Sequence, residues 1–235
     1  MEPGALRDRL TDALRGWTAG YAEVRVERTR ATRVAFRGKR LEGANESVDA
    51  GGCVRVLVEG RGWGVASFTS LDDIPAMLGT AEEMSRAVRL EAPIRLAPGV
   101  AREAEVVPEV DGDPRDVSLP EKRRLLEHLN GLMLAASDRI ADTTASYFDN
   151  WTEWAFANSE GTWLYEVRPE IGLSAQATAR DGEVIERALE SLGLRRGWRS
   201  VQDQDRMFRT AAERALALLK APLAPTLGPT KAPTC

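Results

Sequence analysis

GGCVRVLVEGRGWGVASF, residues 51–68, decides how the first part of the chain is built. Apolar residues alternate with charged or small ones on both sides of a glycine-rich bend, and this period of two predicts two strands joined by a tight turn. Gly60, Gly62 and Gly64 also suggest a phosphate-binding loop. Such a loop needs G-x-G-x-x-G after a strand and at the start of a helix, whereas here the spacing differs and a β-rich run, VASF, follows. The glycines therefore predict a hairpin turn with positive φ.

Two segments before this hairpin extend the pattern. YAEVRVER at 21–28 alternates in the same way, and TRVAFRGKRLEGANESVD at 32–49 has a turn signal around Gly38. Short strands separated by tight turns predict sequential antiparallel pairing. Apolar residues at helical spacing predict one amphipathic helix before these strands, at 5–19, and one after them, at 71–88.

The chain after residue 117 repeats this order of elements. Ser118 as N-cap, a proline in the first turn and Glu121 at N3 predict the start of a helix over 119–137. Strands follow, with turn signals at Asn158-Ser159-Glu160-Gly161 and at Asp181-Gly182. A last amphipathic helix, QDRMFRTAAERALALLKA, completes the second set.

Together these segments predict an α+β fold of two helix–antiparallel sheet–helix layer units joined by a proline-rich connection. The predicted divisions are an amino-terminal α+β domain, a linker, a middle α+β domain and a disordered tail, at residues 1–90, 91–117, 118–220 and 221–235. The tail, APLAPTLGPTKAPTC, is too poor in large apolar residues to order itself.

Composition excludes several classes of function. The chain has 235 residues and a formal net charge of −4, so its overall field gives no reason to expect nucleic acid or an anionic membrane as a partner. No run approaches the roughly 18 apolar residues that span a bilayer. The first residues, MEPGALRDRLTDAL, lack the layout of a secretory signal, and the protein is predicted to be cytoplasmic.

Few residues are suited to metal or nucleophilic chemistry. The two cysteines, Cys53 and Cys235, are predicted to be a buried, inert strand thiol and a mobile chain end. His128 is the single histidine, so a zinc site built on two or three histidines is impossible in this chain. A Ser-His-Asp arrangement would also have to use His128, which falls beside the apolar stripe of its helix and is predicted to lie on the solvent side or at the boundary of that helix.

Two surface features leave alternatives. Trp151, Trp154 and Trp163 lie on neighbouring predicted strands, where aromatic side chains either fill the sheet–helix core or contact an unfolded peptide, and the core interpretation is favoured. The first strands also carry clustered basic residues, but glutamates are interleaved with them as on a solvated strand face, which disfavours nucleic-acid binding. The basic residues are Arg25, Arg28, Arg30, Arg33, Arg37, Lys39 and Arg40.

The order of these pieces resembles a known family. YAEVRVE, then GGCVRVLVEGRGWGVASF, then a helix ending in AEEMSRAV resemble the amino-terminal domain of the TldD/PmbA (TldE) family. SYFDNWTEWAFANSEGTWLYEV followed by ARDGEVIERALESLG is similar to that family's middle region. The resemblance covers about residues 17–220 and is closer to the TldD half of the family than to the TldE half.

The resemblance implies a cytoplasmic protein that pairs as a TldD–TldE heterodimer or a homodimer and encloses a cavity. It further implies a zinc metallopeptidase, in the TldD-type subunit, that cleaves small unfolded peptides. The family's zinc motif, HExxxH, lies in a carboxy-terminal domain, where two histidines hold zinc and the glutamate acts as general base.

This sequence departs from the family at that motif. It has no HExxxH, and its one Glu-His pair, Glu127-His128, is reversed and lacks a second histidine. No catalytic, cofactor-binding or metal residue is therefore predicted, and zinc is expected only in a full-length family member. The chain is expected to be the non-catalytic amino-terminal portion of a TldD-like peptidase, as a fragment or truncated form, with a TldE-like subunit or a second copy as partner and unfolded peptide as substrate. The alternatives are a catalytically dead paralogue or a partner-binding module, with nucleic-acid binding less favoured.

Overall fold

The computed structural model describes residues 2–92, 94–97 and 99–222. The prediction of a disordered tail and that of a mobile Cys235 lie outside these residues from position 223 onward. The helices are α1 (Pro3–Leu14), α2 (Ile74–Ala87), α3 (Leu119–Leu134) and α4 (Asp205–Leu218), with short 3-10 turns at Leu71–Asp73, Pro114–Asp116 and Trp198–Val201. The strands are β1 (Tyr21–Arg37), β2 (Arg40–Leu57), β3 (Trp63–Phe68), β4 (Glu103–Val106), β5 (Ile140–Asn158), β6 (Trp163–Asp181) and β7 (Val184–Leu194).

All seven strands belong to one sheet, in the order β3-β2-β1-β5-β6-β4, with β7 also paired to β6. β4 and β7 pair with the same edge of β6 at different positions along that strand, since β4 pairs with residues 163–166 and β7 with residues 171–181. Pro169 of β6 lies in the gap between them, where no neighbouring strand needs the N–H that proline lacks.

The predicted α+β class is confirmed, and the two sets of elements share a single sheet. β1, from the first set, pairs antiparallel with β5, from the second, from Glu23↔Asn158 to Arg37↔Thr144. β1, β2, β5 and β6 have 17 to 19 residues each, several times the typical strand length of about 5–6. The halves are therefore joined through their central strands as well as through the 91–117 connection.

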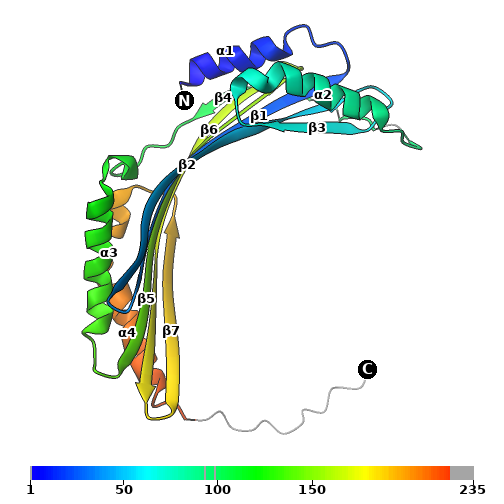
Figure 1. Ribbon diagram of the computed structural model, residues 1–235. Helices are drawn as coiled ribbons and strands as arrows, with labels where there is room; N and C mark the ends of the chain where they lie inside the picture. Colours follow the sequence, from blue (N-terminus) through cyan, green and yellow to red (C-terminus); the bar gives the residue numbers. More distant parts are fainter. Residues whose placement is uncertain (1, 93, 98, 223–235) are drawn as a thin grey trace, which may run out of the picture.

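The sheet is bent into an arc, and all four helices lie on its convex side (Figure 1). α1 and α2 cover the end that carries β3, and α3 and α4 cover the end that carries β7. Each pair of helices packs on its own apolar cluster, one containing Leu10, Val24 and Leu78 and the other Leu129, Leu173 and Phe208. Among the described residues, no helix lies on the concave side (Figure 1).

Glycines form the predicted turns. Gly38 between β1 and β2, Gly161 between β5 and β6, and Gly182 between β6 and β7 have φ values of 52°, 89° and 59°. A side chain at such a φ is sterically costly, which explains why glycine occupies these positions. The 158–161 turn is closed by the Asn158 side chain, whose Oδ1 accepts from the main-chain N–H groups of Glu160 and Thr162.

The glycines of the opening stretch serve a hairpin and a helix contact. Gly60 has a φ of 72° in the turn between β2 and β3, and VASF continues as β3, so the hairpin prediction is confirmed. Gly64 faces α2 so closely that a Cβ there would lie 1.8 Å from the Ala81 carbonyl oxygen. A Cβ on Gly62 would lie 2.3 Å from Val88. Glycine at these positions lets α2 lie directly on β3.

The proline-rich connection is partly ordered by the sheet, which its composition did not predict. Glu103–Val106 forms β4 and runs parallel to the start of β6, with Glu103 opposite Trp163. Further on, the Asp113 side chain accepts from the main-chain N–H of Arg115 at 2.8 Å and caps a short 3-10 turn. The connection thus extends the sheet at one point and folds back on itself at another.

Candidate functional site

Strand alternation gives the sheet two chemically different faces. Every buried position of β5 is odd-numbered, and these residues point toward the helices. The even-numbered residues of β5 point to the concave side, together with the odd-numbered residues of β1 that pair with them, as in Arg25↔Phe156 and Arg33↔Phe148. No helix in the described part of the chain covers this second face, so its side chains are not shielded by a helix along the length of the strands.

Four arginine–aromatic pairs lie along the concave face. In each, a guanidinium lies over an aromatic ring, an arrangement worth about 0.5–1 kcal/mol at exposed sites. The contacts restrict the arginines while leaving N–H donors on the surface. The pairs, with the distance from the guanidinium carbon to the ring centre, are Arg55–Trp63 (4.2 Å), Arg25–Phe156 (5.5 Å), Arg168–Trp154 (5.3 Å) and Arg33–Phe148 (5.4 Å).

A buried carboxylate anchors one end of this row. Glu23 is only 4% exposed and accepts hydrogen bonds from the Tyr21 hydroxyl at 2.7 Å, from Arg25 Nε at 3.0 Å and from Arg55 Nη1 at 3.2 Å. Burial, followed by the hydrogen bond to Glu23, raises the pKa of Tyr21 to about 12. Glu23 therefore fixes both arginines in place and is itself fully hydrogen-bonded.

A second ion pair lies on β6. Arg168 Nη2 donates to Glu166 Oε2 at 2.6 Å, and this hydrogen bond is the main reason that the pKa of Arg168 is raised. The same bond lowers the pKa of Glu166, against a smaller opposing effect of burial. Glu27 also contributes to the raised pKa of Arg168, which indicates that its charge acts across the concave face.

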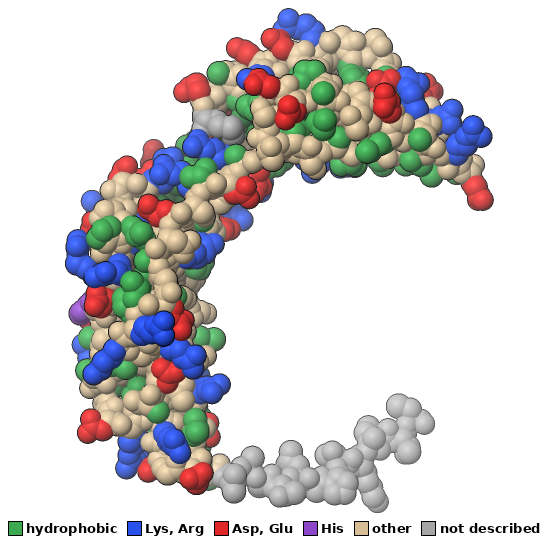
Figure 2. Space-filling model, in the orientation of Figure 1, with side chains coloured by type: hydrophobic (Ala, Val, Ile, Leu, Met, Phe, Trp, Pro, Cys, Tyr) green, Lys and Arg blue, Asp and Glu red, His purple; other side chains and the backbone are tan. Residues whose placement is uncertain are grey.

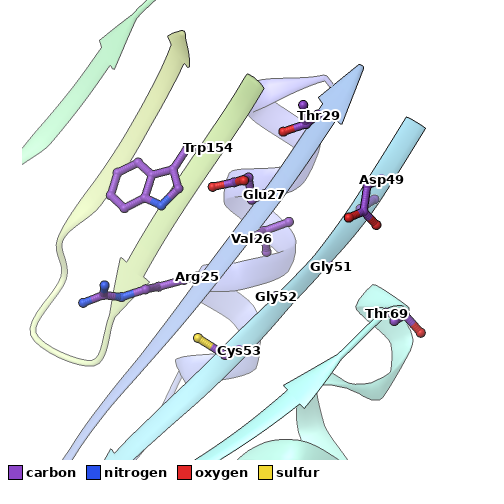
Figure 3. Close-up of a pocket in the computed structure, with 11 residues that line it drawn as sticks. Arg25, Val26, Glu27, Thr29, Asp49, Gly51, Gly52, Cys53, Thr69 and Trp154 are labelled. Carbon is purple, nitrogen blue, oxygen red and sulfur yellow. The ribbon is translucent and has the colours of Figure 1, made fainter. Parts of the chain in front are cut away.

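A cavity of about 420 Å³ opens on the concave face where β3 ends. Arg25, Glu27 and Trp154 lie along one side of it and Asp49 and Thr69 along the other (Figure 3). The main chain of β2 at residues 49–53 forms its floor. The cavity therefore combines two carboxylates, an indole ring and a strand edge.

Cys53 also lines this cavity, which corrects the prediction that it is buried. It is half-buried and free. It stands opposite Arg25 in the β1–β2 ladder, so the same alternation that places Arg25 on the concave face places Cys53 there.

The convex face contains a buried polar cluster between the two apolar clusters. Lys122 of α3 donates to Thr32 Oγ1 at 2.9 Å and forms an ion pair with Asp149 at 2.8 Å. The Tyr147 hydroxyl donates to the same carboxylate oxygen, Asp149 Oδ2, at 2.6 Å, and Thr32 donates to the other, Oδ1. Burial, followed by the charge of Asp149, raises the pKa of Tyr147. Each of these groups has a partner, so the cluster is a structural network.

The residues of the described chain do not fit zinc. Among them, no group of three or more His, Cys, Asp or Glu side chains is placed to hold a metal ion. His128 projects from the outside of α3 with its side chain 57% exposed, and its Nε2 lies 3.2 Å from Asp205 Oδ1. The prediction that His128 lies on the solvent side or at the boundary of its helix is confirmed, with the side chain on the solvent side.

The structure separates the three tryptophans that the sequence grouped. Trp151 and Trp163 are 6% and 1% exposed and belong to the convex apolar cluster, as the core interpretation predicts. Trp154 lies on the opposite face, where its ring stacks on Phe156 with centres 6.1 Å apart and lines the cavity. The core interpretation is therefore wrong for Trp154, whose even number in β5 places it on the concave side.

Most arginines of the first strands are already paired. Arg28 lies 3.8 Å from Glu153, and Arg37 donates to Asp142 at 3.0 Å. Arg33 donates to the main-chain carbonyl oxygens of Thr32 and Asp149. These arginines do not form an open cationic stripe that would suit a nucleic-acid backbone.

Sequence reasoning missed two parts of this arrangement. Lys122 stands four residues before Leu126 and seven before Leu129, so helical spacing alone assigns it to the buried stripe of α3. A lysine in that stripe signals a buried carboxylate partner, which is Asp149. The concave row of arginines and aromatic rings has no comparable signal, because polar positions that alternate in a strand are also typical of an ordinary solvated face.

Comparison with known proteins agrees with this architecture. Two family models match the chain: PmbA/TldA metallopeptidase domain 1 over residues 22–91 and PmbA/TldA metallopeptidase central domain over residues 112–219. A metalloprotease of Synechocystis is 30% identical over 204 residues, which cover 87% of this chain and 44% of the relative. A metalloprotease of Methanothermobacter thermautotrophicus is 30% identical over 210 residues, or 86% of this chain and 44% of that protein.

Solved structures share the fold at low sequence identity. A putative modulator of a DNA gyrase from Thermotoga maritima matches with a TM-score of 0.75 and 18% identity, over 94% of this chain and 50% of that one. TldE from Thermococcus kodakarensis matches with a TM-score of 0.66 and 15% identity, over 90% of this chain and 47% of that one. The chain spans about half the length of each relative. With both family models covering most of its residues, it belongs to the TldD/PmbA family of metallopeptidases, whose domain 1 and central domain it contains.

Proposed function

We propose that this chain is the non-catalytic amino-terminal portion of a TldD-like zinc metallopeptidase that acts on small unfolded peptides. In this proposal the chain forms one wall of the peptide cavity and a surface for a partner subunit in the cytoplasm. Zinc and the residues that bind it belong to the rest of a full-length member, since the donors of the described chain do not fit a metal site.

The observation that supports this function is the open concave face. It is continuous over the long central strands, carries no helix, and presents four arginine–aromatic pairs along its length. Figure 2 shows the inner side of the arc free of covering atoms from the described residues. A surface of this size with fixed polar donors and aromatic rings suits a ligand that is extended.

The chemistry of this face matches an unfolded peptide. An unfolded chain exposes main-chain carbonyl oxygens that accept hydrogen bonds from guanidinium groups, whatever its sequence. Aromatic rings add contact area for apolar side chains with little loss of side-chain freedom. Because Glu23 and the rings already hold Arg25 and Arg55, little ordering remains to be done when a peptide binds.

The partner surface is proposed to include the β7 edge. Val184, Ile185 and Leu189 are 48%, 51% and 56% exposed on this edge strand. Exposed apolar side chains beside an unpaired strand edge are typical of an interaction surface. A TldE-like subunit or a second copy of the chain is the proposed partner.

A catalytically dead paralogue, or a partner-binding module, is the alternative, because the same concave face serves either role. Nucleic-acid binding is less favoured, since the arginines of the first strands are largely paired with carboxylates, carbonyl groups or rings. None of the helices in the described part of the chain has the length and apolar character needed to cross a bilayer.

The test combines the isolated chain with a chimera. The isolated chain, incubated with zinc and an unfolded peptide, is expected to bind no stoichiometric metal and to cleave nothing. Fused to the remaining portion of the Synechocystis metalloprotease, in place of the 204 matched residues, it is expected to support cleavage of unfolded peptide and not of a folded protein. Stoichiometric zinc with cleavage by the isolated chain contradicts the proposal, as does a folded chimera that binds zinc but leaves unfolded peptides intact.

A further inference from the structure

A long strand edge stands open beside the concave cavity. β2 runs from Arg40 to Leu57, but β3 pairs with it only from Gly52 to Leu57. Along residues 40–51 the ladder to β1 is the only strand pairing of β2 in the described structure. The main-chain groups that point away from β1 along these residues are therefore open to another strand.

The cavity begins where the line of β3 stops. Gly51 lies beside the end of β3, where an added Cβ would be 3.1 Å from the Phe68 carbonyl oxygen, and Thr69 lies just beyond. A strand added to β2 at this point would continue the line of β3. Since side chains alternate between the two faces of a sheet, every second side chain of the added strand would point to the concave side, where the cavity lies.

The charges around this position specify the side chain that fits. The side chains of Glu27 and Asp49 line the cavity, and neither side chain makes a hydrogen bond or ion pair with another described residue, although the charge of Glu27 also acts on Arg168. The one cation of the lining, Arg25, is already bound to Glu23 at 2.9 Å. The indole of Trp154 completes the cavity; because Arg168 already lies over its ring, it offers the peptide a contact for the alkyl stem of a basic side chain.

We propose that the 40–51 edge of β2 binds an extended peptide by strand addition, with a lysine or arginine side chain of that peptide in the cavity between Glu27 and Asp49. This rests on the proposed function, and it names the place and the class of peptide. Main-chain hydrogen bonds supply the affinity, and the cavity supplies the preference for a basic residue.

A second copy of the same edge fits less well. The edge carries Arg40, Glu42, Glu46 and Asp49, so one positive and three negative charges leave a net charge of −2. Antiparallel pairing of two such segments about their centre places Glu42 of one opposite Asp49 of the other, and like charges opposite each other are destabilising. A basic peptide has the complementary charge.

The test uses the whole 235-residue chain and fluorescence-labelled peptides. The probe is a seven-residue peptide of alternating threonine and valine with a central lysine, and its matched control has glutamate at the centre. Two further versions carry N-methyl groups on alternate amides, one set in each phase. Because alternate N–H groups of a strand point to the same neighbour, strand addition predicts that one phase abolishes binding and the other leaves it within about twofold.

The cavity is tested on the protein side. The double variant Glu27→Gln/Asp49→Asn is expected to lower the affinity for the lysine peptide about tenfold and to remove the preference over the glutamate peptide. Glu83→Gln, on the exposed side of α2, is the matched control and is expected to change neither. Circular dichroism of both variants checks that the fold is retained.

The other outcomes separate this inference from the proposed function. Binding that ignores the methylation phase and the central charge overturns the edge site, while it leaves a peptide-holding concave face intact. Light scattering that shows edge-dependent dimers in place of peptide binding identifies a second copy as the occupant and overturns the inference. Absence of binding by every peptide also overturns it, and the chimera then decides the proposed function independently.

Discussion

Lys122 Nζ lies 2.8 Å from Asp149 Oδ2 on the convex side of the sheet, and neither side chain is more than 5% exposed. The pair stands between the two apolar clusters and connects α3 to β5. Thr32 of β1 and Tyr147 of β5 complete its hydrogen bonds. Three elements, α3, β1 and β5, are therefore held together by polar contacts at the border between the two apolar clusters.

Removal of the lysine is predicted to be strongly destabilising. Lys122→Met leaves the Asp149 carboxylate buried without its counter-charge, and breaking such a pair costs about 3–5 kcal/mol of unfolding free energy. Urea denaturation measures the loss. The double variant Lys122→Met/Asp149→Leu is expected to regain part of it, because no unpaired charge remains.

Lys39→Met, in the exposed turn between β1 and β2, is the control for loss of a lysine and is expected to change stability by less than about 0.5 kcal/mol. Equal stabilities for Lys122→Met and the parent chain would show that the buried pair contributes nothing net.

Gly64 is predicted to be intolerant of any side chain. A Cβ at this position would lie 1.8 Å from the Ala81 carbonyl oxygen and 2.7 Å from the Ser85 nitrogen, so Gly64→Ala must push α2 off β3. We expect a cost of about 2–3 kcal/mol, in the range of core overpacking, measured by thermal or urea unfolding.

Gly79→Ala is the matched control, because Gly79 lies within α2 and an added Cβ meets nothing within 4 Å. It is expected to be neutral or to stabilise by up to about 1 kcal/mol, since alanine favours a helix more than glycine does. A destabilised Gly79→Ala together with an unaffected Gly64→Ala would reverse the structural assignment of the two glycines.

The three tyrosines are predicted to ionise at a higher pH in the folded protein than in the unfolded chain. Burial is the largest cause of the raised pKa in all three tyrosines. The pKa values of Tyr21 and Tyr165 are raised to about 12 from a reference of 10.0. The pKa of Tyr147 is also raised. Ultraviolet difference absorbance against pH is expected to show almost no tyrosinate near pH 10 in the folded chain, and about half ionisation there in urea, where the pKa returns to its reference of 10.0.

The stability effect has a defined sign. A group whose pKa is higher in the folded state adds stability that is complete below its unfolded pKa and is lost as the pH rises through the folded value. For Tyr21 and Tyr165 the loss is expected between about pH 10 and pH 12. Glu23→Gln is expected to lower the pKa of Tyr21, because the carboxylate is the second cause of the shift. An unchanged titration in that variant contradicts the assigned hydrogen bond.

Replacement of Trp154 is predicted to weaken peptide binding, whereas replacement of Trp163 is predicted to lower stability. Trp154→Ala removes an aromatic ring from the concave face and is expected to weaken binding of an unfolded peptide roughly fivefold or more, with the fold retained. Trp163→Ala opens a hole in the convex core and is expected to cost about 3–5 kcal/mol. Fluorescence anisotropy and urea denaturation measure the two effects. Equal loss of stability in both variants would place Trp154 in the core.

The elements were predictable where local chemistry decides them. Gly38 and Gly182 mark turns because they take positive φ, and Ser118 marks the start of α3, although its side chain makes no capping hydrogen bond there. The pairing of β1 with β5 was not predictable, since more than a hundred residues separate the paired positions. β4 was missed because its alternation, Glu-Ala-Glu-Val, is only four residues long and lies within a proline-rich, acidic stretch that is typical of a connection.

The candidate site was predictable only in part. A single histidine, which composition alone reveals, rules out a zinc site built on two or three histidines. The polar side of a strand has the same sequence pattern whether it faces bulk water or the inside of a curved sheet. Arg25 and Phe156 could therefore be assigned to the proposed binding face only once the curvature of the sheet was known. The long open edge of β2 likewise depends on where β3 ends.

The β1–β5 ladder has a consequence for any attempt to divide this chain. A piece that stops before residue 91 keeps β1 but loses its neighbour over fifteen consecutive register pairs, from Glu23 to Arg37. In that piece, the edge of β1 would carry a long row of unpaired main-chain N–H and C=O groups. Long unpaired strand edges pair with other chains and lead to aggregation. Proteolytic cleavage within the 91–117 connection, by contrast, would leave the two fragments associated, because β1 and β5 would still be paired.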